Sequence, residues 1–121
     1  MMTEIRNDLQ DQVDAQYETL WALERAGDSE AIHEWIGNAL DIQLTVRSSV
    51  LVDDPAAYMG RKVSVLVTFG GPNVYVDLDS DESQMLTVRG YWGTESVERA
   101  ITAPLIAQAL NDTADLYMGM A

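Results

Sequence analysis

The chain has 121 residues, of which 47% are hydrophobic, and this fits one folded domain that buries a core of its own. Asp and Glu number 20 against 7 Lys and Arg, so the formal net charge is −13, which argues against direct binding to nucleic acid or to anionic membranes and favours a basic partner. Cysteine is absent, which excludes disulfides, thiolate metal sites and thiol nucleophiles and suits a reducing compartment.

Residues 3–26 are predicted to form an amphipathic helix. Apolar residues recur there at helical spacing, Thr3 is a candidate N-cap, and Gly27 stands where a helix commonly ends. Five carboxylates spaced by three or four residues should form a stripe on the opposite side, with neighbours about 5 to 6 Å apart, comparable to the spacing of phosphates on a nucleic-acid strand. This acidic stripe consists of Glu4, Asp8, Asp11, Asp14 and Glu18. It is either a binding surface or a solvated helix face.

A second, shorter helix is predicted over residues 29–38, with Asp28 as its N-cap. Because the connection between the two helices is short, they should form an antiparallel hairpin. The one histidine of the chain, His33, lies one residue off the apolar face of this helix and is interpreted as a bystander.

Alternation of apolar and polar residues then predicts four strands joined as an antiparallel meander. The first runs from residue 40 to about 52, and a loop follows at 53–60. The next three lie within residues 61–92, where a Gly-Gly-Pro-Asn turn and an acidic turn join them.

Helices should cover one face of this sheet, and the other face is either solvated or an interface for a partner or a second copy of the chain. Three apolar or aromatic residues favour the interface. The residues predicted on this face are Lys62, Ser64, Leu66, Thr68, Tyr75, Asp77, Thr87, Arg89 and Tyr91.

The acidic turn, DLDSDES at residues 77–83, contains Asp77, Asp79, Asp81 and Glu82. The spacing of its aspartates is similar to the start of a calcium loop. However, Glu82 stands where such a loop needs Gly and Val88 where it needs Glu, so a standard EF-hand is excluded. Weak cation binding stays open, and a strongly negative hairpin tip that deters edge-to-edge pairing is favoured.

After the fourth strand, residues 91–93 are predicted to lead into a loop, and Pro104 marks the first turn of a final helix that ends near Gly119. Asp112 and Asp115 should point outward near the C-terminus of this helix, where the macrodipole disfavours them. The prediction is one α+β domain spanning residues 1–121, with the order α-α-β-β-β-β-α: an N-terminal helical hairpin, a four-stranded antiparallel meander and a C-terminal helix packed on the sheet.

The sequence offers little material for catalysis. One His, one Lys and no Cys leave few pairs of nucleophile and base, and the Gly70–Gly71 turn lacks the spacing of a phosphate-binding loop. We therefore expect no enzyme, no cofactor and no metal site. A small hydrolase that uses buried carboxylates is a less favoured class, because it requires a concave pocket. The absence of a leader-like N-terminus and of a long apolar run predicts a soluble cytoplasmic protein.

The segments GGPNVYVD and VRGYWG, within residues 63–93, are similar to segments of small phage-encoded proteins. With its small size and acidity, the chain resembles inhibitors encoded by phages and mobile elements, including anti-CRISPR proteins of the DNA-mimic type. The resemblance implies an inhibitor in the cytoplasm of a bacterial host that binds a basic nucleic-acid-binding complex, with a CRISPR effector as the expected target. It would act by charge mimicry through the acidic stripe and the acidic turn. The alternative is a phage structural or assembly adaptor that acts through the aromatic sheet face, with acidity serving solubility.

Overall fold

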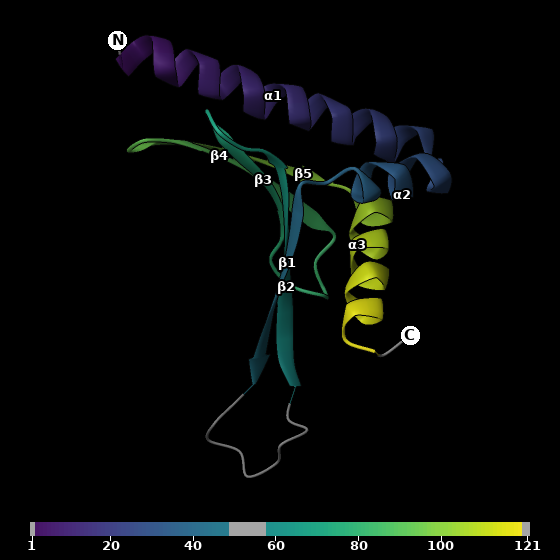
Figure 1. Ribbon diagram of the computed structural model, residues 1–121. Coiled ribbons are helices and arrows are strands. Elements are labelled where there is room, and N and C mark those ends of the chain that lie inside the picture. The colour runs from purple at the N-terminus through teal and green to yellow at the C-terminus, as the bar shows by residue number, and fades with distance from the viewer. Residues whose placement is uncertain (1, 49–57, 120–121) are drawn as a thin grey trace.

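The computed structural model describes residues 2–48 and 58–119, with side chains described for residues 8–46 and 60–119. In this part of the chain, three helices and five strands form an α+β fold (Figure 1). The elements are α1 (Met2–Ala26), α2 (Ser29–Gly37), β1 (Asp41–Ser48), β2 (Tyr58–Thr68), β3 (Asn73–Leu78), β4 (Met85–Trp92), β5 (Glu95–Thr102) and α3 (Pro104–Tyr117). The predicted α+β class is confirmed, and the sheet has five strands instead of four.

The five strands form one antiparallel sheet in the order β1-β2-β3-β4-β5, so each strand pairs with its neighbour in sequence. The meander topology was predicted correctly. The register places apolar residues of one parity side by side, because Val65 lies opposite Ile42 of β1 and opposite Val76 of β3. The buried hydrophobic residues from the three central strands are Val63, Val65, Val74, Val76, Leu78, Leu86 and Val88.

The strand β5 corrects the prediction of a loop after residue 93. Val97 and Ile101 are buried at strand spacing, but Arg99 stands between them at the same parity and interrupts the apolar alternation. A two-residue turn connects β4 to β5, because Trp92 pairs with Glu95. Gly93 has φ 62, which the first central position of a type II′ turn requires.

Two predicted boundaries also change. The strand expected from residue 40 to 52 is β1, which is described as Asp41–Ser48, and the loop expected at 53–60 overlaps β2, which begins at Tyr58. The remainder of that loop, with Asp53 and Asp54, lies outside the described residues. For α2, the predicted cap is confirmed, since the Asp28 carboxylate accepts hydrogen bonds from the backbone N–H groups of Glu30 and Ala31.

The long helix α1 packs across β4 and β5, whereas α3 contacts β2 and β4 (Figure 1). The close approach of α1 to β4 depends on Gly90. A Cβ atom at Gly90 would lie 2.7 Å from the Leu9 Cδ1 atom and 2.7 Å from the Val13 Cγ2 atom, both of which are buried in the core. Glycine is therefore required at this position by the helix above it.

The N-terminus of α3 is capped by a side chain from α1. The Glu24 carboxylate accepts hydrogen bonds from the backbone N–H groups of Leu105 and Ile106, with N···O distances of 3.1 and 2.9 Å. Ala103, at the N-cap position, has no side chain that can do this. The negative charge of Glu24 also lies at the positive end of the helix macrodipole.

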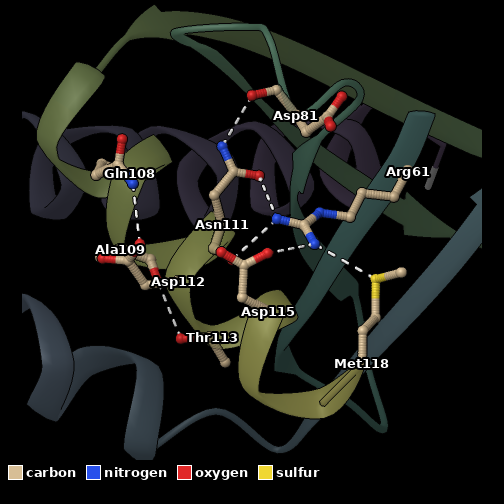
Figure 2. Close-up of polar contacts among 9 residues, drawn as sticks. All are labelled: Arg61, Asp81, Gln108, Ala109, Asn111, Asp112, Thr113, Asp115 and Met118. Atoms are coloured by element: carbon tan, nitrogen blue, oxygen red, sulfur yellow. Dashed lines mark hydrogen bonds and ion pairs between the residues drawn. The ribbon is translucent and has the colours of Figure 1, made fainter. Parts of the chain in front are cut away.

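The C-terminal half of α3 is held by Arg61 of β2, which is 6% exposed (Figure 2). Its guanidinium donates to the backbone oxygen of Asn111 at 3.0 Å and forms an ion pair with the Asp115 carboxylate at 2.7 Å. The Asn111 amide in turn donates to the backbone oxygen of Asp81 in the acidic turn. Asp115 was predicted to be an outward charge that the macrodipole disfavours, and the structure adds that its charge is offset by the ion pair with Arg61.

Candidate partner-binding surfaces

Three members of the acidic stripe lie on the exposed side of α1. Asp8, Asp11 and Glu18 are exposed, while residues of the opposite side, such as Leu9 and Val13, are buried against the sheet. Within the described residues, none of these three carboxylates takes part in an ion pair or a side-chain hydrogen bond. The side chain of Glu4, the first predicted member of the stripe, lies outside the described residues. The predicted solvent-facing stripe thus exists over residues 8–18.

Asp14 belongs to the stripe by its spacing, but its carboxylate is hydrogen-bonded to other side chains of the protein. Its Oδ1 atom accepts hydrogen bonds from Gln10 Nε2 and from Arg99 Nη1, both at 2.9 Å. The Arg99 guanidinium also lies 3.5 Å from the centre of the Tyr17 ring. The hydrogen bond from Gln10, followed by the hydrogen bond and positive charge of Arg99, lowers the pKa of Asp14 below its ordinary value of 3.8. Part of the Asp14 charge is therefore offset within the molecule.

This lowered pKa predicts a pH-dependent contribution to stability. The folded protein holds the Asp14 proton less tightly than the unfolded chain, so the stabilisation is present above pH 3.8 and is lost as pH falls through the lower folded pKa. At pH 7, Asp14→Asn should reduce the free energy of unfolding by about 0.2–1 kcal/mol, the range for an exposed ion pair. Urea unfolding of both proteins at pH 7 and near pH 3 measures whether this difference shrinks in acid. Asp11→Asn is the control, because Asp11 has no such partner, and an equal pH dependence in that variant would contradict the assignment.

The four carboxylates of the acidic turn occupy different environments. Asp79 is 63% exposed, with Lys62 Nζ 3.6 Å from its Oδ1 atom, and Glu82 is exposed. Asp81 is half-buried next to α3. Asp77 has no exposed surface at all. Asp77 therefore offers no carboxylate to a partner in this conformation.

Asp77 lies at the centre of a charged network on the helix-free face of the sheet. It forms ion pairs with Arg89 of β4 and with Lys62 of β2, and Ser64 donates a hydrogen bond to it. Both cationic side chains are about one-quarter exposed and cover the carboxylate. Two positive charges thus balance the charge of Asp77. In the described structure, Asp77 therefore links the three neighbouring strands β2, β3 and β4.

The aromatic residues predicted on this face are half-buried. The Tyr75 and Tyr91 rings meet edge to face, with centroids 6.3 Å apart, and the Tyr91 hydroxyl accepts a hydrogen bond from Arg89 at 3.0 Å. Arg89 therefore connects the charged network to the tyrosine pair. Within the described residues, no helix packs over this face, and it stays available as a surface.

The acidic stripe and the acidic turn are not brought together. The part of α1 that carries Leu9 and Val13, next to the stripe residues Asp8 and Asp11, crosses β4 at Gly90, whereas the turn precedes Met85 at the opposite end of the same strand. Five residues of strand correspond to about 17 Å. The two groups of carboxylates are thus separate surfaces.

A pocket of about 180 Å³ lies between α2 and α3. The polar residues that line it include His33 and Asp112. The Nδ1 atom of His33 lies 2.7 Å from the backbone oxygen of Ser29. The fully buried carboxylate of Asp77 does not line this pocket. Among the described residues, no three His, Asp or Glu side chains are grouped closely enough to hold a metal ion. None of the described helices is long and apolar enough to cross a membrane.

Comparisons with protein-family models, with curated proteins and with solved structures found no match.

Proposed function

We propose that the protein is an acidic inhibitor that binds a basic nucleic-acid-binding complex in the cytoplasm of a bacterial host, through the exposed side of α1. The observation that supports this proposal most directly is the group formed by Asp8, Asp11 and Glu18. These carboxylates are exposed on one helix face, and no cation of the described residues neutralises them. In a chain of net charge −13, they form a fixed negative surface.

The proposed mechanism is charge mimicry. A groove lined by Lys and Arg that normally holds phosphates would instead hold the carboxylates of α1, and nucleic acid would be excluded by competition. A CRISPR effector is the expected target class. Because α1 is a continuous helix packed on the sheet, its carboxylates are held in place before binding, which limits the entropy lost on association (Figure 1). Asp79 and Glu82, exposed at the acidic turn, supply a second and separate negative surface.

The test is a triple charge reversal, Asp8→Lys with Asp11→Lys and Glu18→Lys. The tagged wild-type protein is first used to capture partners from a bacterial lysate, which are eluted with a salt gradient and identified by mass spectrometry. The triple variant should bind the captured complex at least about tenfold more weakly, because three attractive charges become repulsive. Its free energy of unfolding should change much less, since none of the three carboxylates takes part in an ion pair or a side-chain hydrogen bond within the described residues.

The matched control reverses three exposed carboxylates on other elements, Glu34, Glu98 and Asp112. It carries the same change in net charge and should bind more tightly than the stripe variant. Equal loss in both variants would mean that total charge matters and that the stripe is not a site. Unchanged binding by a folded stripe variant would remove α1 from the proposal.

The second candidate function is an adaptor in phage structure or assembly that acts through the helix-free sheet face. The observation that favours it is the Tyr75–Tyr91 pair on a face over which no described helix packs. Salt separates the two functions. Partners held by charge mimicry should elute at moderate salt and be displaced by DNA or RNA, whereas virion proteins held on an aromatic surface should resist salt.

A further inference from the structure

The two edges of the sheet are protected to very different extents. The strand β5 lies beneath α1, and Arg99 places a charge on its inward face, two features that discourage pairing with another strand. The other edge strand, β1, pairs with β2, and no described helix makes extensive contact with it. It contains neither Pro nor Gly to block a further strand. Figure 1 shows its C-terminal part running away from α1 and α2.

The apolar face of β1 is incompletely covered. Ile42 and Leu44 are half-buried, and Val46 is 48% exposed. These three residues lie opposite Val65, Val63 and Arg61 of β2, so they continue the core side of the sheet toward its open edge. An edge of this kind favours addition of another strand, which would satisfy backbone groups and cover apolar side chains together.

The sequence of β1 is complementary to itself about Leu44. If a second β1 pairs with it antiparallel and Leu44 faces Leu44, then position 41 faces position 47, 42 faces 46, and 43 faces 45. The residues at positions 41 and 47 are Asp and Arg, so the register places opposite charges across the strands twice. All other pairs are apolar with apolar or polar with polar. If the register shifted by one residue, the apolar residues of one β1 would face the polar residues of the other.

We propose that the protein forms a two-fold symmetric dimer through antiparallel pairing of β1 with β1 of a second copy, centred on Leu44. The interface is isologous, as a two-fold dimer requires, and it joins two five-stranded sheets into one continuous sheet. This surface differs from the helix-free sheet face. It also leaves the acidic stripe of each copy exposed, so the proposal does not depend on the proposed function.

The first experiment uses the absence of cysteine from the wild-type chain. Light scattering after size-exclusion chromatography should give about twice the monomer mass of 13.4 kDa. The variant Leu44→Cys should form a disulfide-linked dimer under mild oxidation, because directly opposed Cα atoms in antiparallel strands lie about 4.5–5.5 Å apart, within the range of a disulfide. Gln43→Cys and Thr45→Cys should cross-link efficiently when the two proteins are mixed and poorly when each is oxidised alone.

The second experiment exchanges the charged positions. Asp41→Arg and Arg47→Asp each create two like-charge pairs in the dimer and should weaken dimerisation by about tenfold or more. The double variant, which carries both changes, restores two opposite-charge pairs at the wild-type net charge and should recover dimerisation. Recovery cannot come from a change in total charge or from a defect in folding.

A monomer in the scattering experiment at high micromolar concentration would overturn the proposal. So would a dimer in which the single charge variants and the double variant behave alike, or in which Leu44→Cys fails to cross-link while cysteines introduced on the helix-free sheet face do so. These last results would assign the dimer to a different surface.

Discussion

Replacing Gly90 by alanine should lower the free energy of unfolding by about 2–3 kcal/mol, the upper part of the range for overpacking a core. The added Cβ atom would lie 2.7 Å from side-chain carbons of Leu9 and Val13, which are both buried and have little room to move. Either α1 must lift from β4 or both side chains must leave their rotamers. Urea unfolding followed by circular dichroism measures the change.

Gly71→Ala is the matched control. Gly71 lies in the turn between β2 and β3, has no atom within 4 Å of the position of an added Cβ, and does not have a positive φ. Its substitution should change the free energy of unfolding by less than about 1 kcal/mol in either direction. If the two variants were equally stable, α1 would not approach β4 at Gly90 as described.

Replacing Asp77 by alanine should cost about 3 kcal/mol of stability, the lower end of the range for breaking a buried ion pair. Removal of the carboxylate leaves the Arg89 guanidinium and the Lys62 ammonium next to each other without their shared counter-charge. Because each cation keeps about one-quarter of its surface in water, the loss should not reach the value for fully buried charges. Ser64 also loses its hydrogen-bond acceptor.

Asp79→Ala serves as the comparison, since Asp79 is two residues away and 63% exposed. Its effect on stability should be within about 1 kcal/mol. The same two variants distinguish an effect on folding from an effect on partner binding at the acidic turn, because a partner can reach Asp79 and cannot reach Asp77. Equal and small effects of both substitutions on urea unfolding would show that the charged network contributes little to the fold.

The sequence predicts the sheet well where a strand is buried on one face and solvated on the other. In β2, β3 and β4, alternate residues are buried on the side of the helices, and the pattern is visible without knowledge of the partners. The same prediction from alternation fails in β5. An edge strand can carry a charged residue at a position that faces the core, if that side chain reaches a neighbouring element. Arg99 does so by reaching Asp14 and Tyr17 of α1. The turn at Gly93 is the local signal that could have identified this hairpin.

The exposed position of the acidic stripe was predictable because it depends on helical periodicity alone. The pairing of individual carboxylates was not. Asp14 meets a cation 85 positions away in sequence, and Asp115 meets Arg61 across the fold. Asp77 is balanced by neighbours whose placement requires the register of three strands. Local sequence therefore locates carboxylates on an element, but tertiary structure decides which of them keep an uncompensated charge.

The attachment of α3 to three other parts of the fold has a consequence for how the domain can open. Separating this helix from the fold would release Glu24 of α1, Arg61 of β2 and the acidic turn at Asp81 in one step. It would also uncover Ile106 and Leu110, which have no exposed surface. Partial unfolding of α3 should therefore cost nearly as much free energy as unfolding the whole domain. A protease or chaperone would then meet the C-terminal helix as part of one cooperative unit and not as a detachable segment.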